Sequence, residues 1–212
     1  MAWAAGVALS VALATVPVAA KAEDGAGSGP VMLVMGDSLS AEYGIRRDSG
    51  WVALLKERLA QRKLNWRVVN ASVSGETTSG GRSRLQALLD KHKPSLVIIE
   101  LGANDALRGL PLSKMRENLS AMLDMTRQAK ARAVIVGMRI PPNFGRQYAE
   151  EFHASFGQIA KEASATSVPF LLEGVAQDLN FFQADRIHPN EQAQSKLLDN
   201  VWPALEPFVQ KR

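Results

Sequence analysis

Four short polar segments of this chain combine the residue types that hydrolytic chemistry uses. They read GDSLS at 36–40, NASVSGETT at 70–78, GAND at 102–105 and DRIHPN at 185–190. Between them they hold a hydroxyl, carboxylates, an imidazole and an amide, which are the groups that nucleophilic and acid–base catalysis need. These groups can do chemistry only if folding brings the four segments together.

Ser38 and His188 are the candidate nucleophile and base. A serine hydroxyl attacks a carbonyl only when a base removes its proton. His188 falls in a predicted loop, whereas His92 and His153 lie in predicted helices. Asp185, three residues before His188, can hold the imidazole Nδ1–H and leave Nε2 free to accept the serine proton. Alternatively, Asp37 or Ser38 caps the helix that follows, and DRIHPN begins a helix with Asp185 or Asn190 as its cap and Pro189 in its first turn.

Gly75 and Asn104 are candidate donors to the negative charge that builds on a carbonyl oxygen during acyl transfer. Gly75 exposes its backbone N–H because it has no side chain, and the Asn104 side chain carries an amide. Each residue also has a simpler interpretation, since glycine permits a turn and asparagine closes one with its own side chain.

Apolar strand patterns and amphipathic helical patterns alternate along the chain. The apolar runs predict strands over 31–35, 66–71, 95–101, 133–138 and 168–172. Apolar residues at helical spacing predict helices over 50–62, 79–92, 112–130 and 146–164, with a last helix after Pro189. Strands that are apolar on both faces, each followed by a helix, indicate a parallel sheet covered on both sides. The polar segments then follow the carboxyl ends of the strands, where open α/β sheets bind ligands.

Composition and charge are those of one ordinary soluble domain. The chain has 212 residues, of which 46% are hydrophobic and 22% charged, and its net charge of +4 comes from basic residues spread among acidic ones. No run typical of a nucleic-acid-binding arm occurs, and the absence of cysteine excludes disulfides and thiolate metal sites. We therefore expect no nucleic-acid partner, and composition gives no indication of the oligomeric state.

The amino terminus has the pattern of a cleaved signal peptide. Residues 1–20 carry no charged side chain, and Ala20-Lys21-Ala22 supplies the small residues that a signal peptidase recognises. Because the usual basic start is missing, an uncleaved anchor is the alternative. We predict a signal peptide over 1–22, a flexible Gly/Ser-rich linker over 23–30 and one domain over 31–212. The mature protein should then be periplasmic or secreted, without stable membrane insertion.

Taken together, the four polar segments resemble the SGNH (GDSL) hydrolase family over nearly the whole mature chain. By that resemblance Ser38 is the nucleophile, His188 the general base and Asp185 the residue that orients it. Gly75 and Asn104 join the Ser38 N–H in the oxyanion hole. The family implies a flavodoxin-like α/β fold, a three-layer α/β/α sandwich with a five-stranded parallel sheet. It also implies activity like that of secreted acyl-CoA thioesterases, arylesterases and lysophospholipases.

Two loops are candidate walls for the acyl chain. ALRGLP at 106–111 and RIPPNFG at 139–145 mix apolar side chains with Gly and Pro, and in similar thioesterases the corresponding loops border the acyl chain. The residues predicted to bind substrate are Leu107, Arg108, Leu110, Ile140 and Pro141. Both segments are otherwise simple connections between a strand and a helix. Arg108 and Arg139 either meet a phosphate of the substrate or are solvated.

The sequence therefore predicts a serine hydrolase that cleaves esters and thioesters of acyl chains through an acyl-enzyme, with a small-molecule acyl ester or thioester as substrate and with no metal or cofactor. One alternative is a metal-dependent phosphoesterase, because Gly-Asp and Asn-Asp turns after strands also hold paired metals. Its ligands would be Asp37, Asp105, Asp185 and His188. Another alternative is a lipid-binding protein without catalysis, which has no need of a serine–histidine pair.

Overall fold

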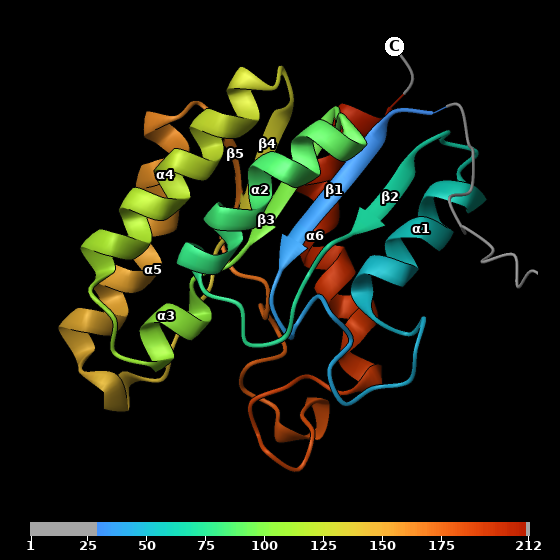
Figure 1. Cartoon of the computed structure of the whole chain (residues 1–212). Coiled ribbons are helices and arrows are strands. Elements are labelled where there is room, and N and C mark those ends of the chain that lie inside the picture. Colours follow the sequence, from blue (N-terminus) through green and yellow to red (C-terminus); the bar gives the residue numbers. More distant parts are fainter. Residues whose placement is uncertain (1–28, 211–212) are drawn as a thin grey trace, which may run out of the picture.

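A five-stranded parallel sheet forms the middle of the molecule (Figure 1). The computed structural model describes residues 29–210. The strands lie in the order β2-β1-β3-β4-β5, and all four pairings are parallel. Their bounds are β1 (Val31–Gly36), β2 (Arg67–Asn70), β3 (Leu96–Glu100), β4 (Arg132–Val136) and β5 (Thr166–Val168). The predicted five-stranded parallel sheet is confirmed.

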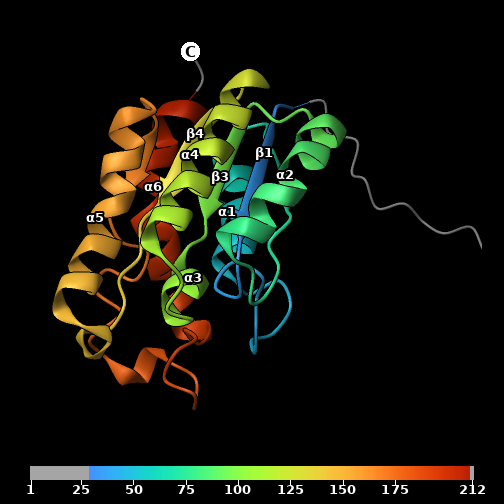
Figure 2. The ribbon, with the colours of Figure 1, turned by 60° about the vertical axis from the view of Figure 1, so that its left-hand side comes forward.

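Helices cover both faces of the sheet and complete the predicted three layers (Figures 1 and 2). One face carries α1 (Trp51–Gln61) and α6 (Gln194–Val209), which pack together. The other face carries α2 (Thr78–His92), α4 (Leu112–Gln128) and α5 (Arg146–Glu162). Short helical turns lie in the connections: α3 (Ala103–Leu107), η1 (Pro142–Phe144), η2 (Leu179–Phe181) and η3 (Glu191–Ala193).

The core lies between the sheet and its helices, as the apolar patterns require. Every residue of the central strands β1 and β3 is buried, since both faces of these strands are covered. α4 buries a stripe at helical spacing that includes Met115, Leu119 and Met122. The polar exception in β3 is Glu100, whose side chain is fully buried at the end of the strand.

The last strand differs from the prediction. The apolar run 168–172 predicts a strand, but β5 ends at Val168. Pro169 has no N–H to donate to a neighbouring strand, and Leu171 instead donates its N–H to Gly137 O, beyond the end of β4. The apolar run therefore forms a buried turn, and the strand begins two residues earlier than predicted.

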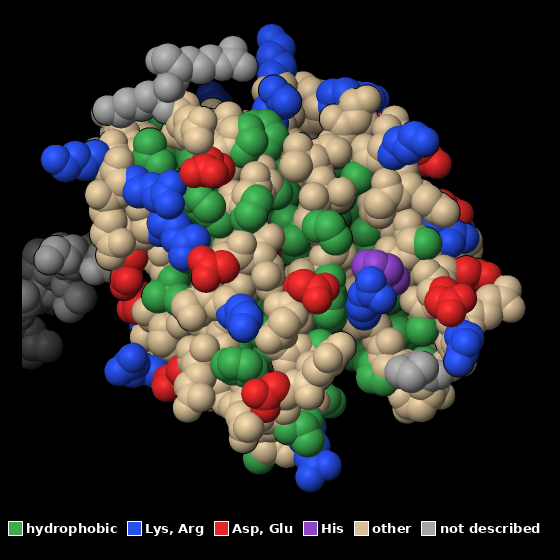
Figure 3. All heavy atoms as spheres, turned by 180° about the vertical axis from the view of Figure 1, so that it is seen from behind, with side chains coloured by type: hydrophobic (Ala, Val, Ile, Leu, Met, Phe, Trp, Pro, Cys, Tyr) green, Lys and Arg blue, Asp and Glu red, His purple; other side chains and the backbone are tan. Residues whose placement is uncertain are grey.

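The connections after the strands gather at one edge of the sheet, at the bottom of Figure 1. On the rear face of the molecule, basic, acidic and apolar side chains are interspersed (Figure 3). Within residues 29–210, no helix is long and apolar enough to cross a membrane. The predicted signal peptide and residues 23–28 of the predicted linker lie outside the described residues.

Candidate active site

Ser38, His188 and Asp185 form a connected chain of hydrogen bonds at this edge. Ser38 Oγ lies 3.0 Å from His188 Nε2, although the two residues are 150 positions apart in the sequence. His188 Nδ1 lies 2.6 Å from Asp185 Oδ2. With Nδ1 protonated toward the carboxylate, Nε2 presents a lone pair to the hydroxyl, which is the arrangement of a serine nucleophile and its base.

The turn after β1 leaves the Ser38 hydroxyl available to the histidine. Asp37 Oδ1 accepts the N–H of Leu39 at 3.0 Å, and Asp37 O accepts the N–H of Ser40 and of Ala41. The side chain that accepts a backbone N–H in this turn is therefore that of Asp37 rather than that of Ser38, and the first helix begins only at Trp51. The side chain of Ser38 is free to bond His188, which argues against its interpretation as a helix cap.

A tight turn places Asp185 against His188. Asp185 Oδ1 accepts the N–H of Ile187 at 2.9 Å and of His188 at 3.0 Å, and Arg186 has the left-handed φ of 58° that this turn needs. Burial raises the pKa of Asp185, but the hydrogen bonds from these two N–H groups and from the imidazole outweigh it and lower the pKa to about 2. Asp185 is thus a carboxylate at neutral pH.

Gly75 and Asn104 lie in the connections after β2 and β3. Gly75 has a φ of 76°, a conformation that glycine adopts without strain. Asn104 Nδ2 donates to Asp37 Oδ2 and to Glu76 O, both at 3.0 Å. The Asn104 amide therefore lies beside the Ser38 turn, but both of its hydrogens already have acceptors.

Two buried carboxyl groups lie beneath the Ser38 turn. Glu100 Oε2 accepts the hydroxyl of Ser40 at 2.7 Å and the N–H of Asp37 at 3.3 Å. Burial raises the pKa of Asp37 to about 6, against the opposing effects of the Leu39 N–H and the His188 charge. Burial and the charge of Asp37 raise the pKa of Glu100 well above its usual value. Because two such close carboxylates do not readily ionise together, Glu100 holds its proton to a higher pH than an ordinary glutamate does.

The predicted acyl-chain loops expose apolar side chains at the same edge. Leu107 is 39% exposed and Leu110 is 40% exposed, and Pro141 is exposed as well. Phe144, which the sequence did not single out, is 40% exposed in the second loop. Such exposure of large apolar side chains is suited to contact with an apolar partner.

The remaining predicted substrate residues differ in their surroundings. Arg108 is exposed and donates from Nη2 to Gly75 O at 2.8 Å, so its guanidinium lies beside the candidate oxyanion segment. Arg139 lies over the Phe170 ring, 5.5 Å from its centroid. Ile140 packs into the hydrophobic core and is only 7% exposed. The prediction that Ile140 lines the substrate site is therefore corrected, because its side chain faces the core.

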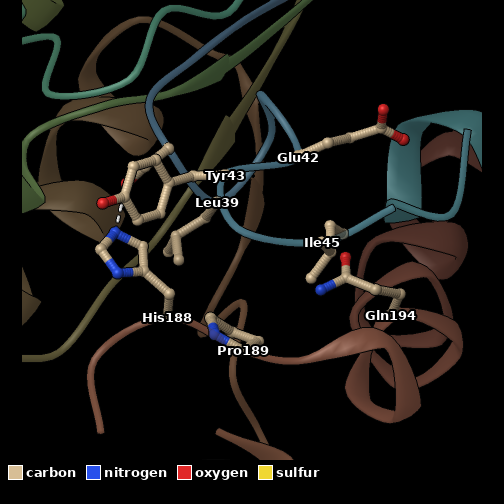
Figure 4. Close-up of a pocket in the computed structure, with 8 residues that line it drawn as sticks. Leu39, Glu42, Tyr43, Ile45, His188, Pro189 and Gln194 are labelled. Atoms are coloured by element: carbon tan, nitrogen blue, oxygen red, sulfur yellow. Dashed lines mark hydrogen bonds between the residues drawn. The ribbon is translucent and has the colours of Figure 1, made fainter. Parts of the chain in front are cut away.

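Tyr43, which no motif marks, contacts the histidine. The ring centroids of Tyr43 and His188 lie 4.5 Å apart with the planes tilted by 42°, and Figure 4 shows the two rings side by side. With Leu39, Ile45 and other neighbours they border a small pocket of about 10 Å³. Ligand pockets are usually many times larger, so this pocket has no room for an acyl chain.

The ligands of the metal alternative have other partners. Asp105 Oδ2 accepts the N–H of Thr78 at 2.8 Å, and its Oδ1 accepts the Thr78 hydroxyl at 2.6 Å. The Asp37 oxygens accept N–H groups of Leu39 and Asn104. In the described part of the chain, no group of three or more His, Cys, Asp and Glu side chains is placed to hold a metal ion. This geometry does not support the phosphoesterase alternative.

Comparison with known proteins establishes the family. The GDSL-like lipase/acylhydrolase family matches residues 34–196. The chain belongs to this family. It is 47% identical over 178 residues to esterase TesA of Pseudomonas aeruginosa, covering 84% of this chain and 89% of that protein. It is 39% identical over 184 residues to thioesterase 1/protease 1/lysophospholipase L1 of Escherichia coli strain K12, covering 87% of each.

Solved structures of esterases share the fold. The crystal structure of TesA matches with a TM-score of 0.82 and 47% identity over 84% of this chain and 99% of that one. A structure of the psychrotrophic esterase EstA from Pseudoalteromonas sp., inhibited by monoethylphosphonate, matches with a TM-score of 0.81 and 38% identity over 85% and 99%. The resemblance to the SGNH (GDSL) family and the expected fold are both confirmed.

Proposed function

We propose that this GDSL-family protein is a serine hydrolase that cleaves carboxylic esters and thioesters of acyl chains. The observation that carries the proposal is the 3.0 Å contact between Ser38 Oγ and His188 Nε2, with His188 held by Asp185. The similarity to proteins named esterase, arylesterase and thioesterase 1/lysophospholipase L1 supports the same reaction class.

The first half of the proposed reaction forms an acyl-enzyme. His188 Nε2 takes the proton of Ser38 as the serine oxygen attacks the acyl carbonyl, and ionised Asp185 stabilises the imidazolium that results. The proposed donors to the oxyanion are the N–H groups of Ser38 and Gly75 and the side-chain amide of Asn104. Since both Asn104 N–H groups already have acceptors, the oxyanion must displace one of these bonds.

The second half returns the enzyme to its starting state. The imidazolium gives its proton to the alcohol or thiol as the tetrahedral intermediate collapses and that group leaves. Water then attacks the acyl-enzyme while His188 takes its proton, and the acid is released as Ser38 recovers the proton. We propose that the exposed side chains of Leu107, Leu110 and Pro141 border the acyl chain, with Arg108 beside its carbonyl end.

The location of the protein is a separate proposal. We propose that it is periplasmic or secreted after cleavage of residues 1–22, because the amino terminus has an uncharged Ala-rich stretch followed by a small-residue cleavage pattern. Amino-terminal sequencing of the protein from a periplasmic fraction should read from Glu23. A chain that starts at Met1 and stays with the membrane would contradict this.

Hydrolysis of acyl esters tests the proposed function. We expect the full chain to release p-nitrophenol from p-nitrophenyl butyrate, with activity unchanged by EDTA. Ser38→Ala should lower kcat by about 1,000-fold or more, since removal of a serine nucleophile costs at least this much. Full activity in Ser38→Ala would contradict the proposal, and acyl binding without any product would favour the lipid-binding alternative.

A further inference from the structure

The side chain of Gln183 joins the loop of the nucleophile to the loop of the base. Gln183 Nε2 donates to Tyr43 O at 2.8 Å and lies 3.2 Å from Pro189 O, to which it also donates. Tyr43 lies five residues after Ser38, and Pro189 directly follows His188. One amide group therefore spans the two loops that must stay aligned for the serine to reach the imidazole.

The backbone fixes Gln183 relative to the base. Its N–H donates to His188 O at 2.8 Å, and its carbonyl accepts the N–H of Arg186 at 2.9 Å. Next to it, Phe182 pairs with Pro189 in an antiparallel bridge. The backbone of Gln183 is thus held in place by the same turn that presents His188. Its side chain extends from that turn to the loop that carries Tyr43.

The loop after β1 leaves room for the Gln183 amide at Gly44. A Cβ added to Gly44 would collide with Oε1 of Gln183, so the amide occupies the space that a side chain at position 44 would fill. Gly44 also has a φ of 70°, in the left-handed region that favours glycine. The contact with Oε1 indicates a close fit between Gly44 and the Gln183 amide, in addition to the hydrogen bonds that Nε2 makes.

The same loop carries the aromatic ring that lies against the base. Tyr43 accepts the Gln183 bond through its backbone, and its ring packs 4.5 Å from the His188 ring (Figure 4). Tyr43 as a whole is 50% exposed. Holding the Tyr43 backbone therefore also holds the ring that packs against the imidazole.

We propose that Gln183 is a positioning residue of the proposed hydrolase, which keeps Ser38 and His188 aligned by bonding Tyr43 O and packing on Gly44. The inference rests on the proposed function. Gln183 contributes no group to the reacting chain of Ser38, His188 and Asp185, so its loss should act through geometry. A misplacement of about 1 Å between reacting groups costs about 100-fold in rate.

Gln183→Met tests the inference, because methionine keeps the length of the side chain but cannot donate. We expect kcat for p-nitrophenyl butyrate to fall about 10- to 100-fold while KM changes little. The variant should still unfold cooperatively on heating. Gln177→Met, at an exposed glutamine in the same connection between β5 and α6, is the matched control and should keep the wild-type kcat.

A double-mutant cycle tests the contact between Gly44 and the Gln183 amide, and it tests the inference even if Gln183→Met fails to fold. Gly44→Ala should lower kcat in the wild type, where the new methyl group collides with the amide and also strains the backbone at a φ of 70°. In the Gln183→Ala background the same change should cost clearly less, because only the backbone strain remains. Additive losses, or an unchanged kcat in folded Gln183→Met, would overturn the inference. An inactive wild type or a fully active Ser38→Ala would instead overturn the proposed function.

Discussion

Replacing Asp185 with asparagine would change which nitrogen of His188 carries the proton. In the wild type, Asp185 Oδ1 accepts the backbone N–H groups of Ile187 and His188, and Oδ2 accepts the imidazole Nδ1–H. Asparagine has one oxygen and one NH₂ group. If its oxygen keeps the backbone bonds, the NH₂ group faces Nδ1, which must then accept, and the ring proton moves to Nε2. The imidazole would then present a donor to Ser38 instead of a lone pair.

The expected effect of Asp185→Asn is a fall in kcat of about 1,000- to 10,000-fold, with little change in KM, as loss of the correct tautomer causes in serine proteases. The opposite orientation of the amide is unfavourable, because its NH₂ group would then face the backbone N–H groups of Ile187 and His188, and two donors cannot bond each other. Wild-type Asp185 has a pKa of about 2, so the loss should persist at every assay pH above about 4.

Hydrolysis of p-nitrophenyl butyrate by the full chain measures this loss. Asp178→Asn is a matched control, because Asp178 also accepts the N–H of the residue two positions later, at 3.0 Å from Asn180. That variant should keep the wild-type kcat. A folded Asp185→Asn protein with wild-type kcat would refute the reasoning, because it would show that the aspartate does not set the tautomer of the base.

Three further predictions follow from the site. Asn104→Ala should lower kcat by about 100- to 1,000-fold, as loss of one oxyanion donor does, and an unchanged kcat would exclude that role. Glu100 has a raised pKa caused by burial and by Asp37, so its contribution to the free energy of unfolding is present below its usual pKa and is lost as pH rises through the raised value. Urea unfolding at several pH values should show this fall in the wild type and a flatter profile in Glu100→Gln. Leu107→Asp and Leu110→Asp should lower kcat/KM for long acyl esters more than for acetate esters, and equal losses would place the acyl chain elsewhere.

The sequence predicts the parts of this fold whose signals are local. The central strands are apolar on both faces and the helices carry clear apolar stripes. The number of strands and long helices, their order along the chain and their approximate bounds therefore follow from pattern alone. The short helix α3 could not be predicted, because five residues are too few for a periodic signal. The predicted end of β5 is wrong, because a buried turn and a buried strand have the same apolar composition.

The candidate site likewise contains residues that the sequence predicts and residues that only the structure shows. Ser38, Asp185 and His188 are marked by residue type, by their place after strands and by the resemblance to a family. Tyr43 and Gln183 have no such mark, because their roles arise from the packing of two loops that are far apart in the sequence. Ile140 shows the converse, since an apolar residue in a loop can face either the substrate or the core, and composition does not distinguish the two.

The most direct test of the central claim is to identify the atom that attacks. A fluorophosphonate ester reacts with an activated serine to give a stable adduct, which the mass of the intact protein and of its peptides reveals. We predict a single adduct on Ser38 in the wild type, and labelling slower by about 1,000-fold or more in His188→Ala. An adduct on another residue, or undiminished labelling of Ser38→Ala, would contradict the assignment of Ser38 as a nucleophile activated by His188.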